Sequence, residues 1–300
     1  MTEKIMEYKE QYQKYFLLSE DALNQAFAEF NKVPEPLLSA MKYSVNAGGK
    51  RLRPVLMFAC ADMFNSDLKN VFPFAAALEI IHTYSLIHDD LPCMDNDDFR
   101  RGIPTNHKVF GEGMAVLAGD GLLNTAFEIM FNTILKNNTT NNIKAAAEIA
   151  KSAGSKGMVA GQSLDLYTVN NMSAGEKELL YIHKHKTGKL LRAALVSGAY
   201  IANAEKDIIK TISETGEEFG ILFQITDDIL DVTGTFENLG KSIGKDEKTN
   251  KLTYIKLYGM EKSKQLALNS AEKIIQMLGS LNINTDFLKQ ITLKMLNRNK

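Results

Sequence analysis

The sequence has no tryptophan, only two cysteines and almost no net charge. The cysteines, Cys60 and Cys93, form neither a CxxC pair nor a disulfide framework, which excludes a disulfide scaffold and indicates a reducing compartment. A formal net charge of -1 excludes the broad positive field that would attract nucleic acid or an acidic membrane surface. Any anion must therefore be bound by a local group of cations.

Long apolar runs are also scarce. We find no stretch that approaches the roughly 20 apolar residues needed to span a bilayer. The first residues, MTEKIMEYKEQYQKYF, carry charges every few positions and lack the apolar run of a secretory signal. These absences predict a soluble, cytoplasmic protein with no nucleic-acid and no membrane partner.

Proline is absent from most of the chain. All six prolines lie in the first 104 residues, so none interrupts a helix after that point. Apolar residues recur at spacings of three and four, the helical period, and alternation typical of strands is nowhere sustained. The segments with this pattern are 114–135, 143–166, 176–202 and 208–232. The sequence predicts an all-α fold.

The breaks between these segments are short. They lie at 33–36, 46–54, 100–106, 137–142 and 169–175, and none is long enough for an interdomain linker. Segments 72–81 and 221–225 are apolar on more than one helical face, which is typical of helices at the centre of a large bundle. We therefore expect residues 1–300 to form a single domain, a large helical bundle.

A first acidic cluster follows an apolar segment in HTYSLIHDDLPCMDNDDFRRG, residues 82–102. It holds Asp89, Asp90 and Asp95. In a regular helix residues 89 and 95 would be rotated by about 600° and would not share a face. Pro92 removes a backbone donor and loosens the helix end, so that these carboxylates can converge.

A second cluster, Asp227, Asp228 and Asp231, interrupts the apolar helix FGILFQITDDILDVTG, residues 219–234. Spacings of three and four place the three carboxylates on roughly one face, where like charges repel unless a cation is present. Such oxygen ligands suit Mg²⁺ that keeps several waters and shares phosphate oxygens. One cluster alone is equally compatible with a solvated acidic face, but two clusters within apolar helices favour a paired metal site.

Several basic groups accompany these carboxylates. The turn GGKRLRP, residues 48–54, offers Lys50, Arg51 and Arg53 to an anion. Further cations are Arg100, Arg101, Lys186 and Lys241. Each alone is equally compatible with a solvated surface residue, but together they suit a reaction with two diphosphates. The sequence has no GxxxxGK[ST] loop after a strand, which argues against phosphoryl transfer.

From about residue 34 onward the sequence resembles the trans-prenyltransferases, and among them the bacterial farnesyl diphosphate synthases. The shared blocks, in the family's order, are GGKRLRP (48–54), HTYSLIHDDLPCMDNDDFRRG (82–102), LAGDGLL (117–123), GMVAGQSLDL (157–166), KTGKLL (186–191) and FQITDDILD (223–231). The resemblance implies a helical bundle of the isoprenoid synthase type, a homodimer, and Mg²⁺, with Mn²⁺ as an alternative.

The resemblance also implies roles for individual residues. The residues that would hold isopentenyl diphosphate are Lys50, Arg53, His82 and Arg101. Those that would hold the allylic diphosphate are Arg100, Lys186, Thr187, Gln224 and Lys241. Asp89, Asp95 and Asp227 would bind the metal, and Asp90, Asp228 and Asp231 would complete its site as ligands, through waters or by supporting hydrogen bonds. The catalytic residues would be Asp89, Asp95, Asp227, Arg100 and Lys186.

The implied reaction is ionisation of the allylic diphosphate, attack by the double bond of isopentenyl diphosphate and loss of a proton to the departing diphosphate. Charge on that diphosphate would be stabilised by the metal and by Arg100, Lys186 and Lys241. Thr187 and Gln224 would face the cationic carbons with oxygen dipoles. No dedicated side-chain base is then needed.

In this family the depth of the apolar pocket beneath the first acidic cluster sets product length. Ser85 lies one helical turn before Asp89, and Tyr84 is its neighbour. A tyrosine there closes the pocket and favours a C15 product, farnesyl diphosphate made from dimethylallyl and geranyl diphosphate. Ordinary core packing of Tyr84, with a C20 geranylgeranyl product, stays open.

Two departures and two alternatives remain. The chain has KTGKL, with Lys189, where the family often has KTGAL, and it has Asn250–Tyr254 where the family often has GKSTY, so Lys251 receives no role.

A class I terpene cyclase would carry a different second acidic motif, N/D-D-x-x-S/T-x-x-x-E. A non-catalytic regulatory subunit would have lost one charged set, and both sets are present.

Overall fold

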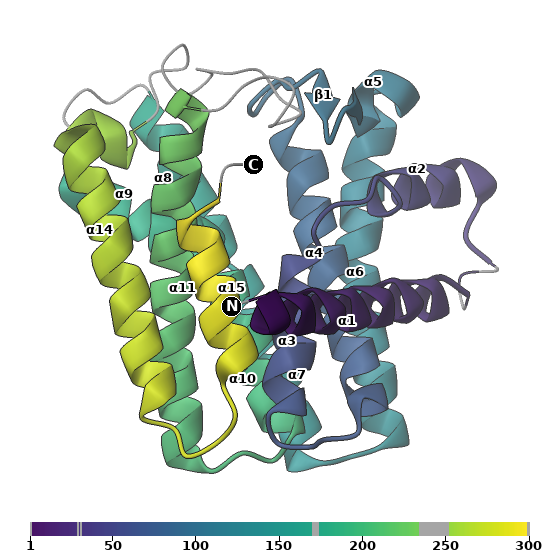
Figure 1. Ribbon diagram of the computed structural model, residues 1–300. Coiled ribbons are helices and arrows are strands. Elements are labelled where there is room, and N and C mark those ends of the chain that lie inside the picture. Colours follow the sequence, from purple (N-terminus) through teal and green to yellow (C-terminus); the bar gives the residue numbers. More distant parts are fainter. Residues whose placement is uncertain (1, 29, 31, 170–173, 234–251, 299–300) are drawn as a thin grey trace.

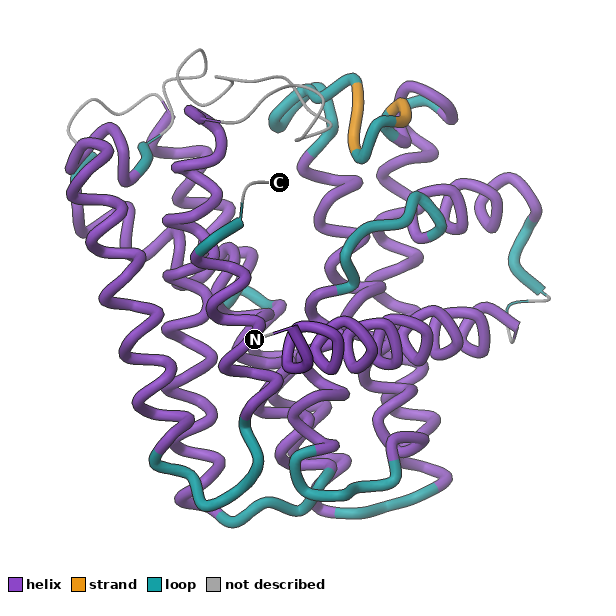
Figure 2. The backbone as a smooth tube through the Cα atoms, in the orientation of Figure 1, coloured by secondary structure: helices purple, strands orange, loops and turns teal. Residues whose placement is uncertain are grey.

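A computed structural model describes residues 2–28, 30, 32–169, 174–233 and 252–298. These residues form a single-domain helical bundle with one short two-stranded ribbon (Figures 1 and 2). The elements of the first half are α1 (Thr2–Ala28), α2 (Glu35–Val45), α3 (Leu52–Asp62), the 3₁₀ turn η1 (Leu68–Val71), α4 (Phe72–Asp89), β1 (Phe99–Arg100), β2 (Ile103–Pro104), α5 (Asn106–Phe110), α6 (Glu112–Lys136) and α7 (Thr140–Ala153).

The described residues of the second half form helices joined by short turns. Its elements are α8 (Met158–Val169), α9 (Glu176–Ile182), the π-helix η2 (His183–Gly188), α10 (Lys189–Ile201), α11 (Lys206–Thr233), α14 (Tyr254–Gly279) and α15 (Asp286–Leu296). In Figure 1 most helices run alongside one another, whereas α1 lies across them. The all-α prediction is confirmed.

The core follows the apolar pattern of the sequence. Residues 54–61 of α3 and 74–81 of α4 are buried without interruption, so these helices present apolar side chains in all directions. In α10 the same holds for residues 193–199. Helices that are apolar all round belong at the centre of a bundle. This confirms the prediction of a buried centre for segment 72–81.

Two predicted helices are divided in the structure. Segments 114–135 and 208–232 each lie within a single helix, α6 and α11. Segment 143–166 instead forms α7 and α8, separated by a turn in which a Cβ on Gly157 would lie 2.1 Å from the carbonyl oxygen of Ser152. Segment 176–202 forms α9, η2 and α10, because its middle adopts π-helical geometry.

The ribbon β1–β2 departs from the all-helical expectation. Phe99 pairs with Pro104 and Arg100 with Ile103 in antiparallel register. The two residues between the strands, Arg101 and Gly102, have φ values of 55° and 80°. Positive φ at both central residues defines the hairpin turn whose twist matches paired strands. The predicted break at 100–106 is therefore a hairpin that fixes the direction of both arginines.

Two described helices are long and apolar enough to cross a membrane by length and composition, so the prediction that no stretch approaches this length is wrong. They are residues 68–89, which include α4, and α6. In the first, 67% of the most apolar window is buried inside the bundle, as expected of a core helix. In α6 only 39% is buried, and its exposed residues include Val116, Leu117, Phe131 and Leu135 among polar ones.

Candidate active site

Two cavities meet below the end of the bundle where α4 and α11 finish, the upper end in Figure 1. One encloses about 650 Å³ and the other about 890 Å³. Arg53 and His82 line both cavities and so form their common wall. Asp89 of the first acidic cluster lines the smaller cavity, and Asp227 of the second lines the larger one. The fold thus brings the two clusters to adjoining spaces.

The smaller cavity is apolar below and polar at its mouth. Its apolar part runs between α4 and α8 and is lined by Tyr84, Met158, Val159 and Leu166. The mouth carries Asp89, Gln162, Lys186 and Thr187. We refer to it as the apolar cavity. Such a shape suits a ligand with a charged head and a hydrocarbon tail.

The larger cavity, which we call the basic cavity, is lined by cations from four parts of the chain. These cations are Lys9, Lys50, Arg51, Arg53, Arg101, Lys294 and Arg298. Guanidinium groups bind phosphate oxygens through paired N–H donors. The predicted set of Lys50, Arg53, His82 and Arg101 therefore lies together around one space.

The turn GGKRLRP supplies this wall through unusual backbone angles. Gly48 and Gly49 have φ values of 80° and 119°, and Arg51 has 46°. A Cβ on Gly49 would lie 2.7 Å from Cζ of Arg101, so glycine is needed for this guanidinium to lie against the turn. Arg101 donates a hydrogen bond to the carbonyl oxygen of Gly48.

Arg51 is held in the core by carboxylates of two distant helices. Its Nε donates to Glu20 at 2.6 Å, and its Nη1 donates to Glu79 at 3.2 Å. Its Nη2 donates to the carbonyl oxygen of Val45 at 2.7 Å. Arg51 thus supports the turn from inside the protein. Its neighbours Lys50 and Arg53 line the basic cavity, where they can bind a ligand.

Arg53 and His82 are partly buried where the two cavities meet. Burial lowers the pKa of Arg53 to about 10, so it stays charged at neutral pH. Burial, followed by the charges of Arg53, Arg101, Arg100 and Arg51, holds the pKa of His82 well below its ordinary value, so the imidazole is neutral. In the part of the chain that the structure describes, Nε of Arg53 is buried without a hydrogen-bond partner. A buried donor of this kind is suited to a phosphate oxygen.

The first acidic cluster begins where α4 ends, as Pro92 predicts. The chain then turns back, and the backbone N–H of Asp95 donates to the carbonyl oxygen of Asp89 at 2.9 Å. The Asp89 carboxylate accepts a hydrogen bond from Gln162 and lies 3.7 Å from Nζ of Lys186. The helix end therefore brings residues 89 and 95 together in a way that a continuous helix does not allow.

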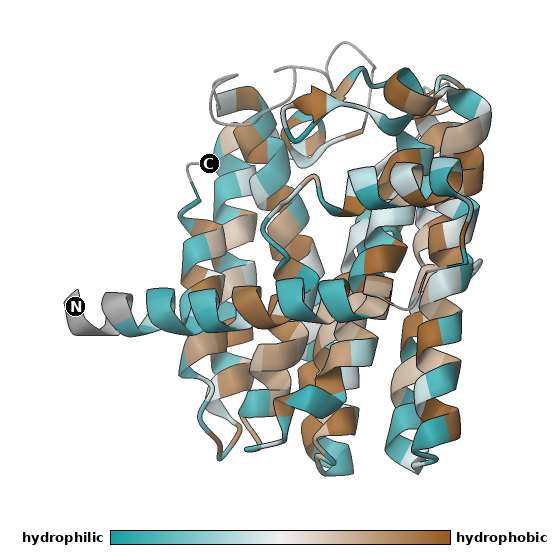
Figure 3. Cartoon of the chain, turned by 90° about the vertical axis from the view of Figure 1, so that its right-hand side faces the viewer, coloured by the Kyte–Doolittle hydropathy of each residue, from teal (hydrophilic) through white to brown (hydrophobic). Residues whose placement is uncertain are grey.

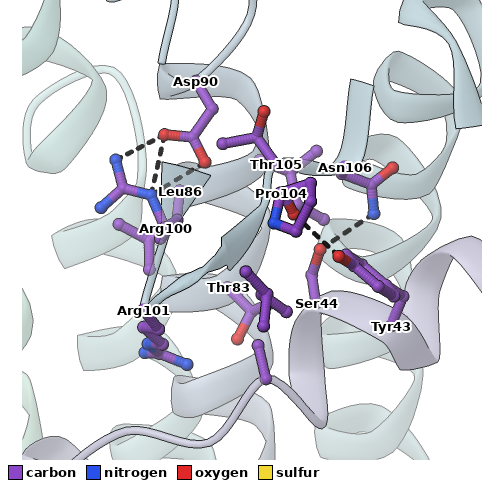
Figure 4. Close-up of a pocket in the computed structure, with 13 residues that line it drawn as sticks. Tyr43, Ser44, Thr83, Leu86, Asp90, Arg100, Arg101, Pro104, Thr105 and Asn106 are labelled. Atoms are coloured by element: carbon purple, nitrogen blue, oxygen red, sulfur yellow. Dashed lines mark hydrogen bonds and ion pairs between the residues drawn. The ribbon is translucent and has the colours of Figure 1, made fainter. Parts of the chain in front are cut away.

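Asp90 and Arg100 pair with each other and line neither large cavity. Nε of Arg100 donates to both carboxylate oxygens of Asp90 at 2.8 Å, and Figure 4 shows Arg100 directed at Asp90 while Arg101 lies apart from it. Burial raises the pKa of Asp90 to about 6, although Arg100 opposes this shift. Their roles at the allylic diphosphate and the metal stay predictions.

In the second cluster only Asp227 is directed at a cavity. Its carboxylate pairs with Arg298, whose guanidinium lies 4.9 Å from the centre of the Phe223 ring. Asp228 and Asp231 are buried. Asp228 accepts from the backbone N–H of Tyr254 at 2.7 Å. The prediction that all three carboxylates share one face is therefore met only in part, and Asp228 supports the second cluster from inside the bundle.

No group of three or more histidine, cysteine or acidic side chains is placed to hold a metal ion among the described residues. Asp89 and Asp227 are oxygen donors on separate helices, each already facing a cation. Such donors fit a Mg²⁺ ion that takes only one or two carboxylates and completes its ligands with phosphate oxygens and water. The residues are thus compatible with metal that binds together with a diphosphate.

The π-helix η2 directs Lys186 and Thr187 into the apolar cavity. Nζ of Lys186 pairs with Asp165 at 2.7 Å, and the Thr187 hydroxyl donates to Oε1 of Gln224 at 3.1 Å. A Cβ on Gly161 would lie 2.1 Å from the backbone nitrogen of Lys186, so this glycine allows α8 to approach η2 closely. Single π turns within helices are frequent at functional sites.

Sequence analysis missed three residues of the site. Gln162 and Asp165 lie in the block GMVAGQSLDL, where two polar residues three apart in an apolar helix are a usable signal. Arg298 lies after the last helix and carries no such signal. Lys189 lies 3.7 Å from Glu217 and lines neither large cavity, whereas Lys241 and Lys251 fall outside the described residues.

Residues 34–290 match the family described as polyprenyl synthetase. The chain therefore belongs to the polyprenyl synthetase family and is a trans-prenyltransferase. This agrees with the resemblance inferred from the motifs, and with two cavities that share Arg53 in their common wall.

Relatives that resemble the chain to a similar degree are named for different products. A farnesyl diphosphate synthase of Micrococcus luteus is 44% identical over 284 residues, 95% of each chain. A chloroplastic geranylgeranyl pyrophosphate synthase of Capsicum annuum is 47% identical over 248 residues, 82% of this chain and 67% of that one. A crystal structure of a geranyltransferase from Helicobacter pylori, complexed with magnesium and isoprenyl diphosphate, has a TM-score of 0.81 and 32% identity over 96% of both chains. The family and fold are thus established, and product length must be argued from this chain's own cavity.

Proposed function

We propose that the protein condenses isopentenyl diphosphate with dimethylallyl and then geranyl diphosphate to give farnesyl diphosphate. The observation that carries this proposal is the pair of cavities that meet at Arg53 and His82, one basic and one apolar. The relative from Micrococcus luteus is a farnesyl diphosphate synthase, and the H. pylori structure holds an isoprenyl diphosphate. Tyr84 in the apolar cavity favours the C15 product over C20.

The basic cavity would hold the diphosphate of the isopentenyl substrate. Lys50, Arg53 and Arg101 supply positive charge there, and neutral His82 supplies an uncharged hydrogen bond. The allylic diphosphate would lie at the mouth of the apolar cavity, beside Lys186. Asp89, Asp95 and Asp227 would hold Mg²⁺, which would neutralise charge on the departing diphosphate.

The reaction would proceed by cleavage of the allylic carbon–oxygen bond, with both electrons leaving on the diphosphate. The hydroxyl of Thr187 donates to Gln224, so its lone pairs can face the allylic cation. The amide of Gln224 is fixed in turn because its Nε2 donates to Asp228 at 3.0 Å. The double bond of isopentenyl diphosphate then forms the new carbon–carbon bond, and the proton it loses passes to the departing diphosphate.

A product assay tests this function. Purified protein is incubated with isopentenyl diphosphate, dimethylallyl diphosphate and Mg²⁺, with and without chelator, and the dephosphorylated alcohols are separated by chromatography. We expect farnesol as the main product, and its loss when chelator is added. Geranylgeraniol would support the C20 alternative, a cyclic hydrocarbon would support a terpene cyclase, and no elongation would support a non-catalytic subunit.

We also propose that a second copy of the chain covers the exposed side of α6. Leu117 and Leu135 lie 18 residues apart, about five helical turns, and therefore point in the same direction. They are 55% and 82% exposed, and Phe131 beside them is 59% exposed. Figure 3 shows the bundle from the right-hand side of Figure 1, with apolar residues in brown interspersed with polar ones in teal.

Analytical ultracentrifugation is expected to give a dimer, and the variant Phe131→Glu/Leu135→Glu a monomer. The new carboxylates of the two copies would face and repel one another, and less apolar surface would be buried at the contact. A monomeric wild-type protein would contradict the proposal. Sedimentation with lipid vesicles would instead assign this face to a membrane.

A further inference from the structure

The His88 ring packs against α6 at Gly119, in a notch that exists because glycine has no side chain. The ring projects from α4, one residue before Asp89, toward Gly119. A Cβ on Gly119 would lie 2.1 Å from Nε2 of His88 and 2.4 Å from Cδ2. Real Cβ atoms do not approach a ring so closely, so any larger residue at position 119 must displace His88. This contact accounts for the first glycine of the block LAGDGLL, to which sequence analysis assigned no role.

Two further contacts fix the ring. Nε2 of His88 lies 3.1 Å from the carbonyl oxygen of Val116, and because this oxygen can only accept, Nε2 carries the proton. One helical turn earlier, Tyr84 meets the His88 ring edge to face, with ring centres 5.7 Å apart and an angle of 83°. Edge-to-face pairs of this kind are a favoured arrangement of rings. His88 is therefore held by α6 on one side and holds Tyr84 on another.

His88 and Tyr84 both line the apolar cavity. We propose that His88 is a positioning residue for product length, which acts by holding Tyr84 in place and is itself held by the notch at Gly119. This inference rests on the proposed function, because it concerns where the growing chain stops. Product length would then depend on how His88 of α4 packs against Gly119 of α6, as well as on Tyr84 itself.

The direction of each effect follows from this geometry. In Gly119→Ala the new methyl group takes the space of the ring, which must turn toward the cavity and shorten it. We expect a larger fraction of C10 product relative to C15. In His88→Ala the ring and its support of Tyr84 are both lost, so the cavity deepens and the fraction of C20 product rises.

The matched control is Gly121→Ala. It makes the same change in the same helix, but its Cβ would lie 3.2 Å from the flexible side chain of Met41, which belongs to α2. The ratios of C10, C15 and C20 alcohols are measured for wild type, Gly119→Ala and Gly121→Ala after equal conversion. We expect the ratio of C10 to C15 to rise at least about threefold in Gly119→Ala, a preference of under 1 kcal/mol, and to be unchanged in Gly121→Ala.

The double variant Gly119→Ala/His88→Ala separates this contact from a general packing effect. With the ring gone, the three closest contacts of the new methyl group are removed, so the double variant should give the long products of His88→Ala. Additive effects of the two changes, or equal product ratios in wild type and Gly119→Ala, would overturn the inference while the proposed function stands. Failure of the wild type to elongate at all would instead overturn the proposed function.

Discussion

Tyr84→Ala is expected to change the main product from C15 to C20 or longer. Tyr84 is 6% exposed and lines the apolar cavity directly beneath Asp89. Removal of its ring deepens the space available to the allylic tail, so geranyl and farnesyl chains can both be accommodated and extended. The measurement is the distribution of alcohols with isopentenyl diphosphate in excess.

Tyr84→Phe is the matched control for this variant. It keeps the ring and removes only the hydroxyl, so the C15 product should be retained. Loss of a buried aromatic ring costs about 3–5 kcal/mol of stability, and the assay of Tyr84→Ala is therefore run well below its unfolding temperature. An unchanged product distribution in a folded Tyr84→Ala protein would refute the assignment of Tyr84 as the floor of the cavity.

Asp89→Asn is expected to lower kcat by about a hundredfold or more, the usual cost of losing one electrostatic contact to a transition state. The change removes a negative charge while keeping the shape of the side chain. It leaves the metal with one carboxylate fewer, so charge on the departing diphosphate is less well neutralised. The measurement is kcat at saturating Mg²⁺ and substrates.

Asp62→Asn is the control for this change. Asp62 accepts hydrogen bonds from Lys14 and Tyr15, each at 2.8 Å, and lines neither large cavity. The kcat of the Asp62→Asn variant should stay within a few fold of the wild-type value. If Asp89→Asn also stayed within that range, a metal role for Asp89 would be refuted.

The fold could be predicted because its signals are local. Apolar residues at helical spacing marked α6 and α11 directly, and Pro92 marked the end of α4. The division of segment 143–166 was missed because Gly154 and Gly157 act through the backbone, and a glycine in an apolar pattern is also tolerated within a helix. The geometry of η2 was missed because a π turn has no distinctive residue pattern.

Site residues could be predicted from the sequence only where they belong to a recognisable motif. GGKRLRP offers three equivalent cations, and the sequence does not show that Arg51 is buried against Glu20 and Glu79 while Arg53 faces the cavities. The pair of Asp227 and Arg298 joins positions far apart in the chain. Contacts of this kind depend on how helices pack, and no spacing within one helix reports them.

Carboxylates of both acidic clusters already have cationic partners in the protein itself. Lys186 lies beside Asp165 and Asp89, Arg100 pairs with Asp90, and Arg298 pairs with Asp227. The repulsion expected within each acidic cluster is therefore relieved before any ligand arrives. Loading of the site becomes an exchange of ionic partners, in which each metal or diphosphate charge replaces an internal one. The strength of these internal ion pairs then sets how readily the site accepts either ligand.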